Sequence, residues 1–274
     1  MKAEQDGLVD YARFATALAI VWFHMEVPGN WIASIAVPAY LVLLTLTSGE
    51  DLATRTKRLL LPFLIWSVIF ALMNIAFSVK RQEPYFEWWE WYMLLTGTWM
   101  HLWIFPFAFL AAQLSPWFQH PLASIGTAVL AATLFALKGT PESLPWGYWS
   151  FGLIPVLVGI AHYAWGWRLA VTTLISSWLI LHFGRPASEN TVLLIGTGLA
   201  VLILSNKLPQ TPMSDWCARL SVWIYLGHPL VIIVGQSLRI SWVELGLFSL
   251  VGSVILAQLI ETVLHASRRD ELEI

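Results

Sequence analysis

Three ionisable residues in the first apolar segment have the spacing of a functional helix face. Asp10, Arg13 and His24 lie in an otherwise apolar stretch that ends at Met25. On an α-helix the eleven-residue separation of Arg13 and His24 puts them on one face, about 16 Å apart along the axis. Asp10 precedes Arg13 by three residues, close enough for an ion pair. Because a charge inside a membrane helix costs roughly 2.5 kcal/mol or more, such a face is expected to point toward protein or water.

These residue types suit proton transfer and the stabilisation of negative charge. His24 is the candidate general base, since a buried neutral imidazole accepts protons near neutral pH. It could deprotonate a hydroxyl, or it could carry an acyl group transiently, and both routes stay open. Arg13, oriented by Asp10, could hold a substrate or stabilise a developing oxyanion. In the competing interpretation Asp10 and Arg13 lie at the water interface, and His24 only bonds a neighbouring helix.

Long apolar runs must position these residues. The 274-residue chain is 58% hydrophobic and 12% charged, and its mean hydropathy is +0.68. Soluble chains average about 25% charged residues, so this composition indicates an integral membrane protein. The apolar runs have the length of a membrane helix rather than that of a barrel strand, which is about ten residues. We expect one all-α domain over 1–274, a polytopic membrane helical bundle with about ten transmembrane helices around a central cavity.

Charge predicts how this bundle is oriented. With ten spans both termini share one side, which then holds ten Lys and Arg against five on the other, out of 15 in the chain. The excess predicts that both termini are cytoplasmic. The single cysteine excludes an internal disulfide, and no paired-Cys or His-x-x-x-His spacing indicates a metal. The expected spans are residues 10–25, 31–47, 59–79, 100–114, 121–137, 149–165, 168–183, 191–206, 219–237 and 243–264.

A basic loop precedes the third expected span. It carries Arg55, Lys57 and Arg58. Arg55 and Arg58, three residues apart where the helix begins, could present two guanidinium groups to phosphates. Alternatively, all three are ordinary cytoplasmic anchors that set the orientation of the chain.

Two later patterns add candidate cavity residues. His101 and Trp103 lie at the head of the fourth expected span, and Tyr225 and His228 share a face of the ninth. A lone histidine at such a position more often satisfies a backbone carbonyl than it catalyses. The tryptophan-rich connection over residues 83–103 fits an aromatic belt, or a surface on which sugar rings stack.

Four patterns occur together and in order along the chain. They are Asp10 to His24, Ser48-Gly49 followed by Arg55-Thr-Lys-Arg58, His101-Leu-Trp103, and Tyr225-Leu-Gly-His228. By these four patterns and their order, the chain resembles the bacterial acyltransferase-3 family of membrane-embedded O-acyltransferases. The resemblance implies essential roles for Arg13 and His24, and an association of Arg55 and Arg58 with an acyl-CoA donor. Lys57, which lies between these two arginines in the sequence, is also a candidate residue for binding the donor. One departure is that the residues before Ser48 are Leu-Thr-Leu-Thr, where many members have Phe-Phe.

The expected function follows from this resemblance. It is a membrane O-acyltransferase, in the simplest case an O-acetyltransferase, of the bacterial cytoplasmic (inner) membrane. It would move the acyl group of cytoplasmic acetyl-CoA, or of another acyl-CoA, to a hydroxyl of a cell-surface or lipid-linked carbohydrate. Membrane lipids are expected partners, whereas nucleic acids and metals are not. The alternative is a polytopic transporter or flippase with a proton or anion path through Arg13 and His24.

Overall fold

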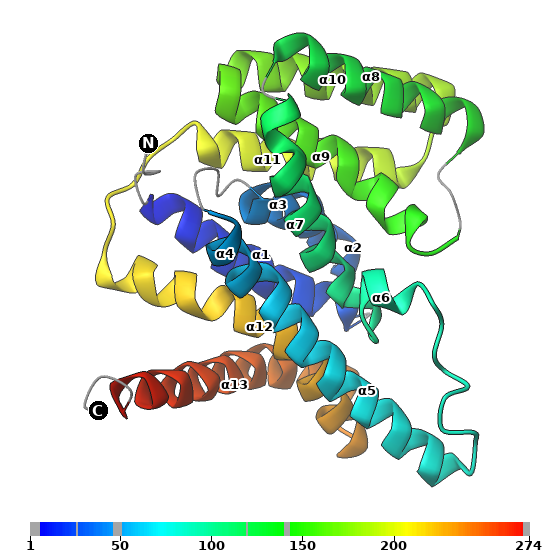
Figure 1. The fold of residues 1–274 in the computed structure, drawn as a ribbon, viewed down its shortest axis with the longest axis vertical. Coiled ribbons are helices and arrows are strands. Elements are labelled where there is room, and N and C mark those ends of the chain that lie inside the picture. Colours follow the sequence, from blue (N-terminus) through cyan, green and yellow to red (C-terminus); the bar gives the residue numbers. More distant parts are fainter. Residues whose placement is uncertain (1–5, 26, 46–50, 119, 140–142, 271–274) are drawn as a thin grey trace.

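The chain folds into packed helices. The computed structural model describes residues 6–25, 27–45, 51–118, 120–139 and 143–270 (Figure 1). Within these ranges all regular structure is helical, so the expected all-α class is confirmed. Besides the helices introduced below, the chain forms α6 (Met93–Thr96), η2 (Met100–Trp103), η3 (Ser115–Phe118), α9 (Trp146–Trp165) and α10 (Trp167–Gly184).

Helix α1 (Gly7–His24) begins and ends where its sequence favours it. The Asp6 carboxylate accepts a hydrogen bond from the Leu8 amide, at 2.9 Å, and so satisfies one free N–H of the first turn. Asp10 lies in the first turn and His24 in the last, the ends at which the helix dipole favours an acid and a base, respectively. The left-handed φ of +83° at Gly29 then turns the chain into the next element.

The second expected span is broken in two. It comprises α2 (Asn30–Ala33) and α3 (Ala36–Thr45), separated at Ser34 and Ile35. Pro38 lies in the first turn of α3, where its missing N–H leaves no helical bond unmade. A ten-residue helix rises about 15 Å, half the thickness of a bilayer core. Together the two helices cover Asn30–Thr45, an apolar stretch of fewer than 18 residues. The expected span over 31–47 is thus interrupted at Ser34 and Ile35, and its last two residues lie outside the described ranges.

Among the described residues, three helical stretches are long and apolar enough to cross a membrane. The first, Leu52–Arg81, joins α4 (Leu52–Arg55), the π-helical η1 (Thr56–Leu60) and α5 (Leu61–Arg81). The others are α12 (Pro212–Ser237) and Val243–Leu264 within α13 (Trp242–Asp270). Helices α8 (Pro121–Lys138) and α11 (Ser188–Leu204) are apolar but shorter.

Two of these stretches carry exposed apolar stripes. On α13, large apolar side chains recur every four residues, from Val243 to Val263, and all are more than half exposed. An unbroken stripe of this kind is unusual on a soluble surface and typical of contact with lipid. These helices support association with a membrane. The exposed apolar residues of α5 are Leu61, Leu64, Ile65, Val68, Leu72 and Val79.

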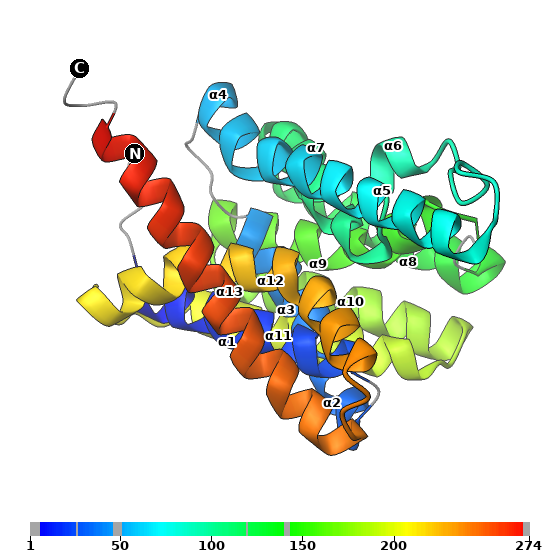
Figure 2. The same ribbon diagram turned by 90° about the horizontal axis from the view of Figure 1, so that it is seen from below.

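The helices form two packed groups. In the first, α12 packs between α1 and α13, and α3 packs on α1. The layer of α5 and α7 (Ile104–Leu114) covers this group (Figure 2). In the second group α8, α9 and α10 pack on one another, and α3 reaches this group through α9 and α11. The core of the first group contains the buried side chains of Tyr40, Phe70, Phe105 and Tyr225. Of the predicted site residues, Arg13, His24, Tyr225 and His228 lie on helices of this group.

Candidate active site

Three histidines from distant parts of the chain meet in the first group. His24 Nδ1 lies 3.2 Å from His228 Nε2, and the two rings stack with centroids 5.0 Å apart. The His101 ring meets the His228 ring edge-on, also at 5.0 Å. The structure thus brings together His24, His101 and His228, three residues that the sequence had placed in three separate patterns.

Neighbouring carbonyls determine which nitrogen of each ring carries the proton. A carbonyl oxygen only accepts, so a nitrogen that faces one must donate. His228 Nδ1 lies 2.6 Å from the Tyr225 carbonyl, which leaves Nε2 of a neutral His228 as an acceptor. His24 Nδ1 faces both that acceptor and the Ile20 carbonyl, the latter at 3.0 Å, so it carries a proton. In a neutral His24 the lone pair is therefore on Nε2.

Exposure distinguishes the three rings. His228 is 1% exposed and His101 is 4% exposed, whereas the His24 side chain is exposed. His24 Nε2 makes no hydrogen bond within the part of the chain that the structure describes. A neutral imidazole with a fixed tautomer, an available lone pair and access from outside meets the requirements of a general base. Of the three rings, His24 is the one that is accessible from outside, and the other two are buried behind it.

The sequence His228-Pro229 explains how His228 is oriented. Proline has no N–H, so Pro229 inside α12 leaves the carbonyl four residues earlier without its helical partner. That carbonyl belongs to Tyr225, and His228 Nδ1 donates to it. At Gly227 the absent Cβ lets Trp66 of α5 and Leu256 of α13 pack closely. Local sequence therefore holds the His228 ring and its tautomer in place.

His101 is positioned by a short anchored segment. Gly97, with φ +78°, turns the chain from α6 toward η2. The Thr98 hydroxyl donates to the Ser67 carbonyl of α5, and the Asn74 amide donates to the Thr98 carbonyl. From α12, the Tyr225 hydroxyl donates to the His101 carbonyl. The segment is thus tied to both α5 and α12, and the Tyr225 hydroxyl supports the cluster rather than pointing into open space.

Arg13 contacts both the Asp10 carboxylate and the C-terminal end of a helix. Its guanidinium lies 3.7 Å from the Asp10 carboxylate. Its Nε and Nη2 atoms also donate to the Leu43 carbonyl, at 3.1 and 2.7 Å. Leu43 lies in the last turn of α3, where carbonyls lack helical partners. The second oxygen of Asp10 accepts from Gln210 at 2.9 Å. Arg13 is therefore an internal clamp, and its contacts are not those of a side chain extended to the interface.

The three basic residues that precede α5 have different surroundings. Arg55 Nη1 donates to the Ala112 carbonyl at the end of α7, at 3.1 Å, while Lys57 is exposed. Arg58 is partly buried and lies close enough to Tyr40 to interact with it electrostatically. Hydrogen bonds from Thr54 lower the pKa of Asp51, which caps α4. Ser48 and Gly49, the motif before this segment, lie outside the described residues.

The structure also shows a residue that the sequence interpretation missed. The Tyr40 ring is fully buried and stacks on Tyr225, with centroids 5.0 Å apart. Arg13, like Arg58, interacts electrostatically with the Tyr40 phenol. Within the described ranges the phenol oxygen makes no hydrogen bond, which is unusual for a buried polar atom. Tyr40 therefore places a potential hydrogen-bond donor between the arginines and the histidine cluster.

Trp103 lies apart from this cluster. Its ring stacks on Tyr148 of α9 at 5.5 Å and contacts Phe107 at 5.8 Å. Among the described residues no ring contact joins Trp103 to the three histidines. Its position in η2, two residues after His101, directs it toward α9. Trp103 thus contributes to the core of the helix group rather than to the cluster.

Comparisons with known proteins do not assign a family. No family model, no curated protein and no solved structure matches the chain. In the described ranges no group of three or more His, Cys, Asp or Glu is placed to hold a metal ion. The histidine rings stack face to face or meet edge-on, and each has a ring nitrogen that faces a backbone carbonyl.

Proposed function

We propose that this protein is a membrane-embedded O-acyltransferase of the acyltransferase-3 type, in the simplest case an O-acetyltransferase. The observation that carries the proposal is the exposed His24, whose Nδ1 donates to its neighbours and whose Nε2 lone pair is available. Arginines and a buried phenol accompany this base on the same helix group. The donor would be acetyl-CoA or another acyl-CoA, and the acceptor a carbohydrate hydroxyl.

The chemical step follows from this arrangement. His24 Nε2 takes the proton of the acceptor hydroxyl as its oxygen attacks the thioester carbonyl carbon. The carbon–sulfur bond then breaks, and the departing thiolate takes the proton back from the imidazolium. Negative charge develops on the carbonyl oxygen in between, and the Tyr40 hydroxyl is our candidate to donate a hydrogen bond to it. His228 holds the tautomer of His24 throughout, so it acts as a positioning residue.

The donor would enter beside the basic segment. Arg58 precedes Phe70, which contacts His101, by twelve residues, or about 18 Å along the helix. An extended acyl-CoA suits such a separation, because its phosphates lie far from its thioester. Arg55 and Arg58 are then the phosphate-binding candidates, while the exposed Lys57 contributes charge without a fixed contact. Arg13, clamped to α3, would support the site from within.

We further propose a multi-pass arrangement in the bacterial inner membrane with both termini cytoplasmic and about ten spans. The excess of Lys and Arg on the expected inner side supports this orientation. The exposed stripes of α5 and α13 support contact with lipid. The basic segment would then lie on the cytoplasmic side, where acyl-CoA is made.

A second candidate function is proton-coupled transport. One observation favours it, namely the continuous contact of three imidazoles from His24 through His228 to His101. Neutral histidines in a row can pass a proton along. This function predicts proton uptake into proteoliposomes that carry the protein. An acyltransferase predicts none.

The deciding experiment follows thiol release from acetyl-CoA by purified protein in nanodiscs. We expect slow release by the native chain and a loss of about 10²–10⁴-fold for His24→Ala. Arg58→Ala should raise the KM for acetyl-CoA about tenfold, one lost charged hydrogen bond being worth about 1.5 kcal/mol or more. Arg168→Ala is the matched control, and a change below twofold is expected because this exposed arginine lies on α10, outside the basic segment. Absence of both binding and thiol release would refute the donor assignment.

A further inference from the structure

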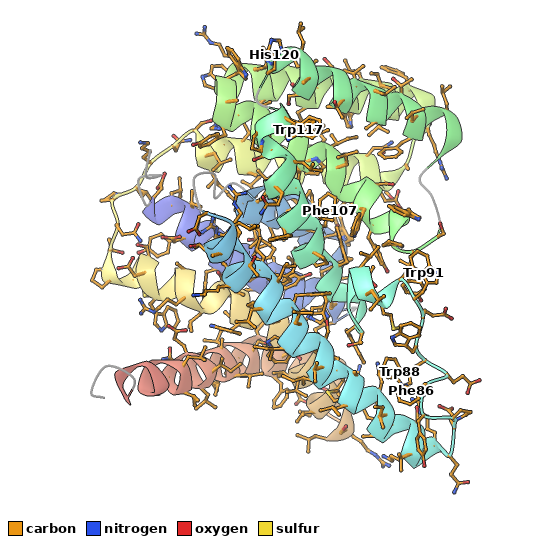
Figure 3. All side chains as sticks on the ribbon, in the orientation of Figure 1. Phe86, Trp88, Trp91, Phe107, Trp117 and His120 are labelled. Atoms are coloured by element: carbon orange, nitrogen blue, oxygen red, sulfur yellow. The ribbon has the colours of Figure 1, made fainter. Side chains whose placement is uncertain are left out.

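A cavity lies at the end of α5 opposite the basic segment. Its volume is about 540 Å³, within the usual range of about 300–1,000 Å³ for small-molecule sites. The C-terminal turns of α5, the connection that follows them, and the last turns of α12 form its walls. In Figure 3 Phe86 and Trp88 lie beside the end of α5, and Trp91 lies farther along the connection. The cavity belongs neither to the histidine cluster nor to the basic segment.

The lining of this cavity combines aromatic faces with neutral polar groups. Trp88 and Trp99 contribute indole rings, while Asn74 and Gln236 contribute amides that can both donate and accept hydrogen bonds. The Trp88 N–H is already bonded to the Tyr85 carbonyl at 2.7 Å, so this ring is held by its edge. Asn74 uses its N–H on Thr98, which leaves its oxygen as an acceptor. A ligand with one apolar face and several hydroxyls fits this combination.

Charge in the cavity argues against an anionic ligand. Its two ionisable residues, Arg81 and Glu83, are exposed and have opposite formal charges. A nucleotide or a free phosphate would find no net positive charge here, in contrast to the basic segment at the other end of α5. The lining therefore favours a neutral ligand.

On both α5 and α12, the residues that line the cavity follow the residues that belong to or contact the histidine cluster, so the cavity lies on the C-terminal side of the cluster along both helices. On α5, Asn74 and Arg81 follow Phe70 by four and eleven residues, about 6 and 16 Å along the axis. On α12, Ile233 and Gln236 follow His228 by about 8 and 12 Å. Trp99 joins the two sites, because its ring stacks at 5.2 Å on Phe70, which contacts His101 edge-on. Along α5 the order is basic segment, histidine cluster and cavity.

We propose that this cavity binds a neutral saccharide unit of the acyl acceptor. The inference rests on the proposed function and adds to it the place where the acceptor is held and the chemical class of the bound unit. One pyranose ring would stack on Trp88 or Trp99, and its hydroxyls would bond to Asn74 and Gln236. A neighbouring sugar of the same chain would then extend toward His24. In the proposed orientation the acceptor enters from the face opposite to the donor.

The test measures saccharide binding in the absence of acetyl-CoA. Maltose, lactose and N,N′-diacetylchitobiose are titrated into the native protein in nanodiscs, and the tryptophan fluorescence is followed. We expect at least one disaccharide to bind, with Kd at least tenfold weaker for Trp88→Ala and also weaker for Gln236→Leu. Trp91→Ala is the matched control, because Trp91 is 55% exposed and does not line the cavity. It should bind as tightly as the native chain.

The outcomes separate this proposal from the proposed function. Binding of a disaccharide that depends on Trp88, by a protein that neither binds acetyl-CoA nor releases thiol, would keep the saccharide site and refute the donor assignment. Thiol release without binding of any of the three at millimolar concentration would overturn the neutral-saccharide assignment and keep the enzyme. Equal weakening by Trp88→Ala and Trp91→Ala would also overturn it, since the cavity would then not be the binding site. His24→Ala should still bind the disaccharide.

Discussion

His24 Nδ1 and His228 Nε2 lie 3.2 Å apart, although 204 residues separate them in the sequence. Because His228 uses its other nitrogen on the Tyr225 carbonyl, it can only accept from His24. The contact therefore fixes the ring of His24 and leaves its far nitrogen as the proton acceptor.

Replacing His228 by Phe keeps an aromatic ring in the stack but removes its nitrogens. We expect kcat for thiol release to fall about tenfold, the effect of roughly 1.4 kcal/mol, while the KM for acetyl-CoA is unchanged. Steady-state kinetics measures both values. The melting temperature should also fall, since the Tyr225 carbonyl loses its partner. An unchanged kcat would show that His24 does not depend on His228.

Replacing Pro229 by Ala should separate stability from activity. The new N–H can bond to the Tyr225 carbonyl, which then no longer needs His228. We expect unchanged or higher thermal stability, with several-fold slower thiol release. Pro155→Ala in α9 is the matched control, because Pro155 also lies inside a helix but its freed carbonyl, that of Phe151, has no histidine beside it in the sequence. If both variants lose activity equally, the effect does not come from the tautomer of His228.

Gly97→Ala should disturb the segment that carries His101. The backbone there has φ +78°, which is unfavourable for alanine, and the new Cβ would lie 2.6 Å from Leu102 Cβ. Both the backbone strain and the steric overlap therefore destabilise the variant. We expect a loss of about 2–3 kcal/mol in the free energy of unfolding, together with slower turnover. Gly166→Ala has a similar φ of +83° but open space around the Cβ, and it should lose only about 1–2 kcal/mol. Denaturation in detergent compares the two variants.

Tyr40→Phe removes a single hydroxyl from the core. This oxygen has no hydrogen bond among the described residues, so stability should stay the same or rise by up to about 1 kcal/mol. If the hydroxyl donates to the thioester oxygen during reaction, kcat should fall about 10²-fold. Thermal melts and thiol-release kinetics on the same preparation measure both effects. A variant with native kcat would exclude Tyr40 as the oxyanion donor.

Local parts of the site could be predicted from sequence. The period of α1 places Arg13 and His24 on one helix, and the three-residue spacing of Asp10 and Arg13 predicts their ion pair, found at 3.7 Å. The spacing of Tyr225 and His228 likewise predicts a shared face of α12, on which both contact His101. These relations depend only on helical geometry, so they need no knowledge of the neighbouring helices.

Contacts between helices could not be predicted in this way. Hydropathy indicates which residues avoid water but not which helix lies opposite. The sequence therefore predicted that His228 lines a central cavity, but not that its ring contacts His24 directly. Backbone carbonyls are the same at every residue, and for that reason the bond from Arg13 to the Leu43 carbonyl has no sequence signal. The break at Ser34 and Ile35 was missed because the residues around it are as apolar as those of a continuous span.

Arg13 and Arg55 each donate hydrogen bonds to a carbonyl at the end of a helix. This hydrogen bonding is a different property from the positive charge that both residues carry. Arg13 binds the last turn of α3, and Arg55 binds the last turn of α7. Membrane orientation depends on the number of positive charges, whereas hydrogen bonding to a carbonyl depends on the planar guanidinium group with its several N–H donors. Lysine at either position would preserve the charge and lose much of the hydrogen bonding. A topology assay would therefore not detect this substitution, although the ends of α3 and α7 would be less firmly held.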